Sequence, residues 1–229
     1  MGRIWKAYAT QFRWLLLQAG ARKLEAGIDR LQQRATRLSQ AERIAPAAAL
    51  TRIHESLARH PFFRNKRPVP VASAFWCDAG LGGLARWLRA AGYRAWWDAA
   101  IDDDDLLARA ARDKAALLTT DSMLMERRLL RDRVIVAFWL PPTLQIAEQL
   151  DLIFREFGLS VGSPRCMSCG GELKPGDKQA LRDQIPPRTF RWRDEYFVCA
   201  DCGKLFWHGT HWEKIQTRLR QAKTRTQVP

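Results

Sequence analysis

The sequence predicts an α/β protein with a parallel sheet and helices on both faces, preceded by a helical N-terminal arm and followed by a small cysteine-rich domain. Three observations predict this architecture. Short apolar runs alternate with helical patterns between residues 71 and 157, apolar residues recur at helical spacing before residue 60, and two CxxC pairs occur late in the chain. With 229 residues, 47% of them hydrophobic, the chain can bury the core of one medium domain with small attachments.

The first part of the chain, residues 1–70, is predicted to form a basic helical arm and a linker. Apolar residues at helical spacing are Ile4, Tyr8, Phe12 and Leu15 and, after Pro46, Leu50, Ile53 and Leu57. Basic residues of the polar face include Arg22, Lys23, Arg30, Arg34 and Arg37. A solvated helix face explains these charges without a partner. Three prolines between residues 61 and 70 stop the helix, so this stretch is expected to be a linker.

Residues 71–160 carry the alternation that is typical of βαβ units. The predicted strands are the apolar runs VASAFWC, YRAWW, AALLT and VIVAFW, and the segments between them have helical patterns. A further helix is expected through Leu150 and Phe157. Strands that alternate with helices form a parallel sheet, because each crossover places a helix on one of its faces.

Acidic residues follow the predicted strands. Asp78 comes after the first strand and Asp121 after the third, while four aspartates, Asp102 to Asp105, open the second crossover helix. Aspartate is a favoured N-cap, so capping explains any one of these positions alone. Ligands of open α/β sheets, however, bind beyond the carboxyl ends of the strands. Three carboxylate positions at that edge repel one another unless a cation lies among them, which indicates Mg²⁺ or Mn²⁺.

Residues 161–213 are predicted to form a zinc ribbon. The ligands are the cysteines of the knuckles CMSCG and CADCG, namely Cys166, Cys169, Cys199 and Cys202. A redox CxxC pair explains one motif but not both, whereas four thiolates give a closed tetrahedral zinc site. Cys77 stands alone in an apolar strand and is expected to be a small buried side chain. His208 and His211 are assigned to packing or RNA contact, because the ribbon already has four ligands.

The charge of the chain indicates a polyanionic partner. Lys and Arg number 38 against 24 Asp and Glu, a net charge of +14. Between the knuckles, basic residues for phosphate contacts alternate with aromatic residues for stacking on unpaired bases. The candidate RNA-binding residues are Lys174, Lys178, Arg188, Arg191, Trp192 and Arg193. Trp192 equally suits the small core of the ribbon, and the basic tail, residues 214–229, suits either a helix or a disordered arm.

The chain shows no signal for a membrane or for secretion. No apolar run is long enough to span a bilayer. The N-terminal apolar patch is interrupted by Arg13 and lacks a long signal-type core and a cleavage site. The cysteines are odd in number and four of them are paired as metal ligands, which does not fit a secreted disulfide framework. These features predict a cytoplasmic protein.

Three segments of the chain together resemble one known family. The segments DAGLGGLARWLRAAGY, DDDDLLARAARDKAALLTTD and CADCGKLFWHGTHW, in this order, are similar to the Mut-seven C-terminal ribonuclease domain family. The resemblance covers residues 74–212 and implies a PIN-like fold joined to a zinc ribbon. It also implies a ribonuclease whose acidic residues hold Mg²⁺ or Mn²⁺. By position, the family's acids match Asp78, Asp103 and Asp121, with Asp104 or Asp105 as replacements for Asp103.

Two functions follow as hypotheses. The first is a metal-dependent ribonuclease that hydrolyses RNA phosphodiester bonds while the ribbon and the basic arms hold RNA, expected to be single-stranded. The second is a catalytically weak or inactive PIN-like protein that binds RNA or associates with the ribosome. Its N-terminal arm would then dock on structured RNA or on another protein. The first crossover helix has no acidic residue where many PIN nucleases carry one, which favours the second function.

Overall fold

The computed structural model of the protein describes residues 2–61, 72–132 and 134–226. The predicted linker between residues 61 and 70 lies, apart from Pro61, outside the described residues. The chain forms two compact units. The first unit consists of Met1–Pro70 and Thr119–Gln145, and the second consists of Val71–Leu118 and Ile146–Pro229.

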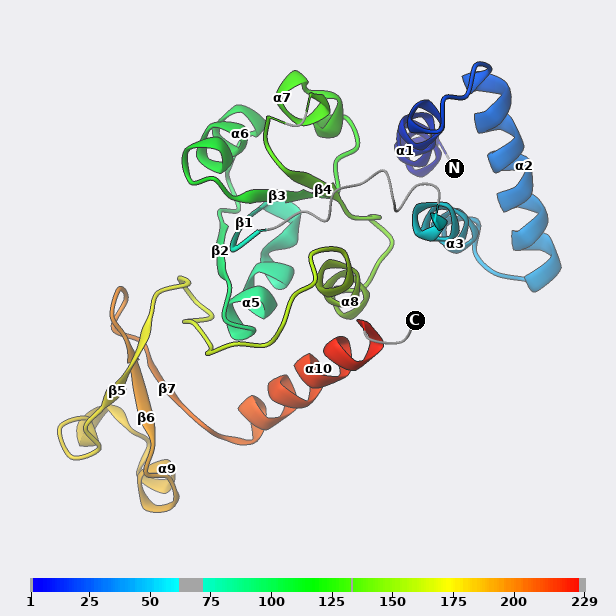
Figure 1. Cartoon of the computed structure of the whole chain (residues 1–229). Coiled ribbons are helices and arrows are strands. Elements are labelled where there is room, and N and C mark those ends of the chain that lie inside the picture. The colour runs from blue at the N-terminus through cyan, green and yellow to red at the C-terminus, as the bar shows by residue number, and fades with distance from the viewer. Residues whose placement is uncertain (1, 62–71, 133, 227–229) are drawn as a thin grey trace. The chain divides into compact units, whose positions relative to one another are not determined.

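The N-terminal arm consists of three helices, coloured blue to cyan in Figure 1: α1 (Gly2–Gln18), α2 (Leu24–Glu42) and α3 (Pro46–Arg59). Local sequence explains where the helices stop and start. Gly20 has φ +73° just after α1, and Arg43 caps α2 in the left-handed region with φ 53°. Pro46 is the first residue of α3. Its ring fixes a helical φ, and an N–H at this position would have no partner within the helix. The predicted helical arm is therefore present as three helices.

The apolar faces of the arm form a core of their own. The buried residues of this core are Tyr8, Phe12, Ile28, Ala35, Ala49, Leu50, Ile53 and Trp139. Trp139 belongs to β4 (Ala137–Trp139), and its ring meets that of Tyr8 edge to face, with centroids 5.3 Å apart. Ile4, which the periodicity places on the same face, is 39% exposed. The arm thus packs on a strand of its own chain.

The α/β core contains a four-stranded sheet in the order β2-β1-β3-β4. The first three strands are β1 (Ala74–Cys77), β2 (Arg94–Trp97) and β3 (Ala116–Thr119). β1 runs parallel to both of its neighbours, and Cys77 is paired with Trp97 of β2 and with Leu118 of β3. All four predicted apolar runs contain a strand, and the predicted α/β fold class is confirmed.

Helices cover the sheet. In Figure 1, α5 (Gly82–Ala90) and α8 (Ile146–Glu156) lie on one face of β1 and β2, and α6 (Asp103–Arg112) lies on the other. A 3-10 turn, Ala79–Leu81, leads from β1 into α5. A second turn, Leu124–Glu126, and the short α7 (Arg128–Arg131) follow β3 within the first unit.

The C-terminal part contains a second sheet and a long helix. The strands β5 (Leu173–Gly176), β6 (Tyr196–Cys199) and β7 (Leu205–Trp207) are antiparallel and adjacent in this order. A 3-10 turn, Arg182–Gln184, and α9 (Pro187–Trp192) lie between β5 and β6. We call this sheet and its cysteine loops the ribbon. The helix α10 (Thr210–Thr226) packs on α8 with Ile215 and Leu219 buried, so the tail is helical through residue 226. No helix of the described residues is long and apolar enough to cross a membrane.

Candidate functional site

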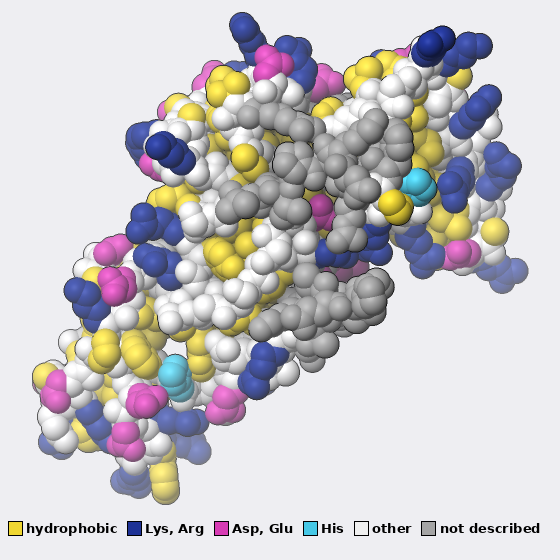
Figure 2. Space-filling model, viewed as in Figure 1, with side chains coloured by type: hydrophobic (Ala, Val, Ile, Leu, Met, Phe, Trp, Pro, Cys, Tyr) yellow, Lys and Arg dark blue, Asp and Glu magenta, His cyan; other side chains and the backbone are white. Residues whose placement is uncertain are grey.

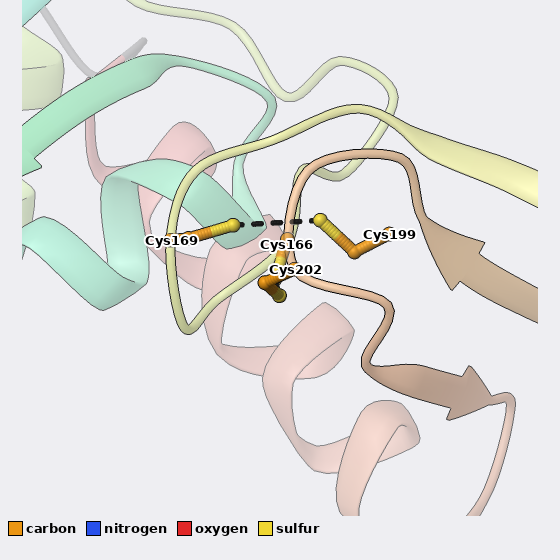
Figure 3. A group of neighbouring side chains, drawn as sticks. All are labelled: Cys166, Cys169, Cys199 and Cys202. Atoms are coloured by element: carbon orange, nitrogen blue, oxygen red, sulfur yellow. Dashed lines mark hydrogen bonds between the residues drawn. The ribbon is translucent and has the colours of Figure 1, made fainter.

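Four cysteine side chains of the ribbon point toward one another, as Figure 3 shows. The Sγ atoms of Cys166, Cys169, Cys199 and Cys202 all lie within 4.8 Å of one another. Two of the sulfur–sulfur distances are 3.4 Å, between Cys169 and Cys199, and 3.7 Å, between Cys166 and Cys202. A tetrahedral zinc ion with Zn–S bonds of about 2.3 Å places its sulfurs about 3.8 Å apart. The distances therefore fit such an ion with small adjustments.

The two knuckles share one backbone geometry. In each, the N–H of the glycine after the second cysteine donates to the carbonyl of the first, Gly170 to Cys166 over 2.7 Å and Gly203 to Cys199 over 3.0 Å. Both glycines have positive φ, +86° and +69°, which L side chains rarely adopt. The Gly171 N–H also donates to the sulfur of Cys169 over 3.4 Å. The repeated glycine thus allows the turn that brings each pair of thiols together.

Four thiolates so close together are unfavourable without a cation. Burial raises the pKa of the Cys169 thiol to about 12. Burial also raises the pKa of Cys199, but the backbone N–H groups of Cys202 and Asp201 outweigh it, and this pKa falls to about 7. A divalent cation that replaces the protons removes the repulsion. The four cysteines can therefore hold a metal ion such as zinc.

Asp78 directly follows β1, at the carboxyl end of the strand. Its N–H donates to the carbonyl of Leu118 in β3 over 2.9 Å. Its Oδ1 accepts from the Ala79 N–H over 2.6 Å and so caps the turn before α5. The indole N–H of Trp97, the last residue of β2, donates to the Ala79 carbonyl over 2.8 Å. The half-buried Asp78 is therefore held in a loop that both neighbouring strands fix.

The glycines after Asp78 are explained by close packing. A Cβ atom on Gly82 would lie 2.5 Å from the Trp97 ring, and one on Gly83 would lie 2.5 Å from Ile146 of α8. Real Cβ atoms essentially never come so close to another atom. The GLGG sequence thus lets α5 start directly against β2 and α8, which positions the loop of Asp78.

The four-aspartate run divides between a cap and the first turn of α6. Asp102 is the N-cap, and its Oδ1 accepts from the Asp105 N–H over 2.8 Å. The carboxylate of Asp105 pairs with Arg109 one turn later, at 2.9 Å. Asp103 is the first helical residue, followed by Asp104, and both are exposed. The capping explanation therefore holds for Asp102, whereas Asp103 opens the helix as expected.

Asp121 lies two residues after the end of β3, in the first unit. Its N–H donates to the hydroxyl of Thr119 over 2.9 Å, and its Oδ1 accepts from the Met123 N–H over 2.7 Å. The side chain is exposed. The Thr119 side chain is fully buried and thus anchors the turn in which Asp121 is presented.

Asp98 is an acidic residue that the strand-end reasoning missed. It directly follows β2, whose last residue pairs with Cys77, so Asp78 and Asp98 continue two adjacent parallel strands from the same register. Its Oδ1 accepts from the Ala100 N–H over 3.0 Å, and its Oδ2 lies 3.9 Å from Arg109. The signal was available, because Asp98 follows YRAWW as directly as Asp78 follows its own strand.

Some basic residues between the knuckles contact other side chains of the ribbon, and others are exposed. Lys178 and Arg182 lie over the ring of Phe190, 4.8 and 5.7 Å from its centroid, so cations of the ribbon already cover this ring. Trp192, at the end of α9, is 73% exposed. It therefore does not fill the core of the ribbon, one of the two alternatives left open by the sequence.

The other candidate basic residues have different surroundings. Arg188 and Arg191 lie on α9 with Trp192 and are exposed, as is Lys174 of β5. Lys178 also pairs with Asp194 at 2.8 Å, and Arg193 lies 3.9 Å from Glu213. The exposed group thus consists of Lys174, Arg188, Arg191 and Trp192.

The two histidines after β7 and the lone cysteine were predicted to have structural roles. His208 stacks on Trp212, with ring centroids 5.6 Å apart, and its Nδ1 lies 3.3 Å from Glu195. The side chain of His211 lies outside the described residues. Cys77 is fully buried, as expected for a small core side chain.

Comparison with known proteins gives one family. No curated protein and no solved structure matches the chain. The family model of the Mut7-C RNAse domain matches residues 73–219, from the start of β1 to the buried Leu219 of α10, and leaves out the N-terminal helices. The match spans more than half of the chain and includes the strand-end aspartates and all four ribbon cysteines. The chain therefore belongs to the Mut7-C RNAse domain family.

Proposed function

We propose that the protein is a metal-dependent ribonuclease in which Asp78, Asp103 and Asp121 hold Mg²⁺ or Mn²⁺. One observation carries the proposal: within the stretch that matches an RNase domain, Asp78 and Asp121 follow the neighbouring parallel strands β1 and β3. The carboxyl ends of parallel strands are where α/β sheets bind ligands. Carboxylate oxygens are also the donors that these hard cations prefer.

The residues of the chain have separate parts in this reaction. Asp78 and Asp121 each use one carboxylate oxygen to accept a backbone N–H, which fixes the direction of the side chain. Asp103 adds a third carboxylate at the first turn of α6. A bound divalent cation supplies an activated water and offsets charge on the phosphate. We include Asp98 as a further candidate ligand, because it continues β2 beside Asp78.

We also propose that the ribbon holds a structural zinc ion and binds single-stranded RNA. Four sulfur ligands in a closed arrangement select zinc over the oxygen-preferring cations. The exposed Trp192 offers its ring to an unpaired base, while Arg188 and Arg191 on the same helix supply charge for phosphates. Metal analysis of purified protein should find about one zinc per chain, and clearly less in chelator-free protein would contradict the site.

The test of catalysis is cleavage of a labelled single-stranded RNA with Mg²⁺, with Mn²⁺ and with chelator. Parent protein should cleave only with a divalent ion. Asp78→Asn, Asp103→Asn and Asp121→Asn should each abolish turnover, because a neutral amide is a poor ligand for these cations. An Asn side chain still accepts a backbone N–H, so the caps and the fold should persist. RNA affinity should stay nearly unchanged or improve slightly, because the removed negative charge repels phosphate.

The matched control is Asp177→Asn in the ribbon. Its Oδ1 accepts from the Ala180 N–H over 2.7 Å, so it is a capping aspartate like Asp78 and Asp121, but it follows β5 of the ribbon and not a strand of the parallel sheet. This variant should cleave RNA like the parent. Activity that survives chelator, or survives in Asp121→Asn, would exclude the metal mechanism.

A second candidate function is RNA binding without turnover, and one feature of the arm favours it. Arg30, Arg34 and Arg37 fall within one stripe of α2, opposite the buried Ile28, and Lys23 is the residue that caps the start of this helix. All four are exposed, and within the part of the chain that the structure describes none of them is ion-paired. Figure 2 shows Lys and Arg side chains gathered over α2. Together with the absence of an acidic residue in α5, this stripe supports a protein that holds RNA by its backbone phosphates.

The two functions are distinguished by measuring RNA binding and RNA cleavage on the same protein samples. The binding protein predicts tight RNA association in low salt and no cleavage with any divalent ion. Replacing Arg30, Arg34 and Arg37 with Gln should then weaken binding and flatten its salt dependence, because fewer counterions are released. Under the ribonuclease proposal, the same replacement weakens binding but leaves turnover at saturating RNA unchanged.

A further inference from the structure

The segment between α8 and the ribbon forms hydrogen bonds with the turn between α5 and β2. The Tyr93 hydroxyl accepts from the Ser160 N–H and donates to the Ser160 carbonyl, both over 2.9 Å. The Gly162 N–H donates to the carbonyl of Ala91 over 2.9 Å. Gly92 has φ +101°, and a Cβ atom there would lie 2.7 Å from a backbone oxygen of the segment. The chain therefore lies directly against the α/β core just before the ribbon begins.

Arg89, at the end of α5, extends this junction into the first knuckle. The side chain is only 4% exposed. Its Nε donates to the carbonyl of Ala95 in β2 over 2.7 Å. Its Nη1 donates to the carbonyls of Met167 and Ser168 over 3.1 and 2.8 Å. One guanidinium thus joins a strand of the sheet to the two residues between the first pair of cysteines.

The guanidinium brings a buried positive charge into this junction. Its hydrogen-bond acceptors are neutral carbonyls, and among the described residues no Asp or Glu forms an ion pair with it. Burial lowers the pKa of Arg89, and the neighbouring sulfur groups of Cys77, Cys169 and Cys166 act against this shift. A buried cation is costly unless an anion lies close to it. A zinc ion bound by four thiolates has a net charge of −2 and is the anionic neighbour that this guanidinium fits.

We propose that Arg89 is a positioning residue that holds the first knuckle in metal-binding geometry and couples zinc binding in the ribbon to the stability of the α/β core. This inference rests on the zinc site proposed above. Hydrogen bonds one step beyond the ligands orient them in other metal sites. Here the guanidinium fixes the turn that carries Cys166 and Cys169, and it reaches β2 through Ala95. Zinc binding therefore stabilises the sheet through the side chain of Arg89.

The test compares the full-length parent with Arg89→Met, Arg89→Lys and a matched control, Arg86→Met. The control removes an exposed arginine from the preceding turn of the same helix. Zinc affinity is measured by competition with a chromophoric chelator. In Arg89→Met it should fall roughly tenfold to a hundredfold, the range for residues that orient metal ligands. Arg89→Lys should lose less, because it keeps the charge but not the planar fork, and Arg86→Met should match the parent.

A second readout separates coupling from a general loss of stability. Zinc removal should lower the melting temperature strongly in the parent and in Arg86→Met, but little in Arg89→Met. A side chain with only a structural role lowers the melting temperature equally with and without zinc. If Arg89→Met does not fold, Arg89→Lys gives the same comparison. A zinc affinity and a zinc-dependent shift like those of the parent in the Arg89 variants overturn the coupling, whereas a parent that binds no zinc overturns the zinc site itself.

Discussion

The hydroxyl oxygen of Tyr8 in α1 lies 2.6 Å from that of Thr51 in α3, and both side chains are buried. The hydroxyl of Thr143, after β4, lies 3.0 Å from Thr51 and 3.5 Å from Tyr8. Three hydroxyl groups from distant parts of the sequence thus meet inside the first unit. Since each needs a partner when buried, they fix how α1 and α3 lie against the segment after β4.

Replacing Tyr8 should change how stability depends on pH. Burial raises the pKa of Tyr8 above its ordinary value of 10.0, so its contribution is complete below pH 10 and is lost as pH rises through the folded-state pKa. In Tyr8→Phe the free energy of unfolding should fall by about 1 kcal/mol at pH 7, because hydrogen bonds are lost. Its decline between pH 9 and pH 11 should be shallower than in the parent. Urea unfolding at these pH values measures both effects, and parallel declines contradict the prediction.

Removing the Trp139 ring should detach the N-terminal helices. This ring is 3% exposed and contacts Tyr8, so Trp139→Ala should cost about 3–5 kcal/mol of unfolding free energy, as for other large aromatic residues in cores. Limited proteolysis should then cut between α1 and α3 faster than in the parent. Trp192→Ala is the control, because an exposed ring contributes about 0.5 kcal/mol or less. Equal losses in the two variants would show that the ring of Trp139 does not hold the arm.

The two knuckle glycines should differ in their tolerance of alanine. Both have positive φ, which costs alanine about 1–2 kcal/mol. A Cβ atom on Gly203 meets nothing within 4 Å, whereas one on Gly170 lies 3.3 Å from Arg89 Nε and 3.5 Å from the Ala95 carbonyl. Gly170→Ala should therefore lower the melting temperature and the zinc affinity more than Gly203→Ala. A larger loss of melting temperature and zinc affinity in Gly203→Ala would contradict the prediction, because contacts of the new Cβ atom would then not determine the cost.

Trp192 and the arginines in and directly after α9 should affect RNA binding in different ways. Trp192→Ala should weaken binding of single-stranded RNA by about 1–3 kcal/mol, with the same dependence on salt, because stacking releases no counterions. Replacing Arg188, Arg191 and Arg193 with Ala should both weaken binding and flatten the salt dependence. Fluorescence anisotropy across a salt series measures both quantities. If the triple variant binds like the parent, the RNA surface lies elsewhere and the stripe on α2 becomes the candidate.

Much of the fold can be predicted from local patterns in the sequence. The apolar runs of β1 and β3 predict strands because a strand buried on both faces needs consecutive apolar residues. The two cysteines of each CxxC pair lie close together because their spacing and the glycine after them determine a tight turn. Asp78 and Asp121 could be placed at strand ends because they follow such runs within one or two residues.

Other features depend on contacts that no local pattern carries. The periodicity of α1 marks Tyr8 and Phe12 as buried but does not show that Trp139 contacts Tyr8, because Trp139 lies in a distant strand. The sequence likewise does not show that Lys178 and Arg182 lie over the ring of Phe190. Arg89 is one arginine among many in a basic chain, and only the tertiary structure shows that its guanidinium is buried.

The contact between Tyr8 and Thr143 spans 135 positions, which determines an order of events during synthesis. The helices α1 to α3 leave the ribosome before Trp139 and Thr143, which contact them and follow only after β1 to β3 have been made. At about 5–20 residues per second, this interval lasts roughly 7–27 s. During that time Tyr8 and Phe12 lack the partner that covers them in the native protein. The core of α1 to α3 is thus completed only once β4 has been made.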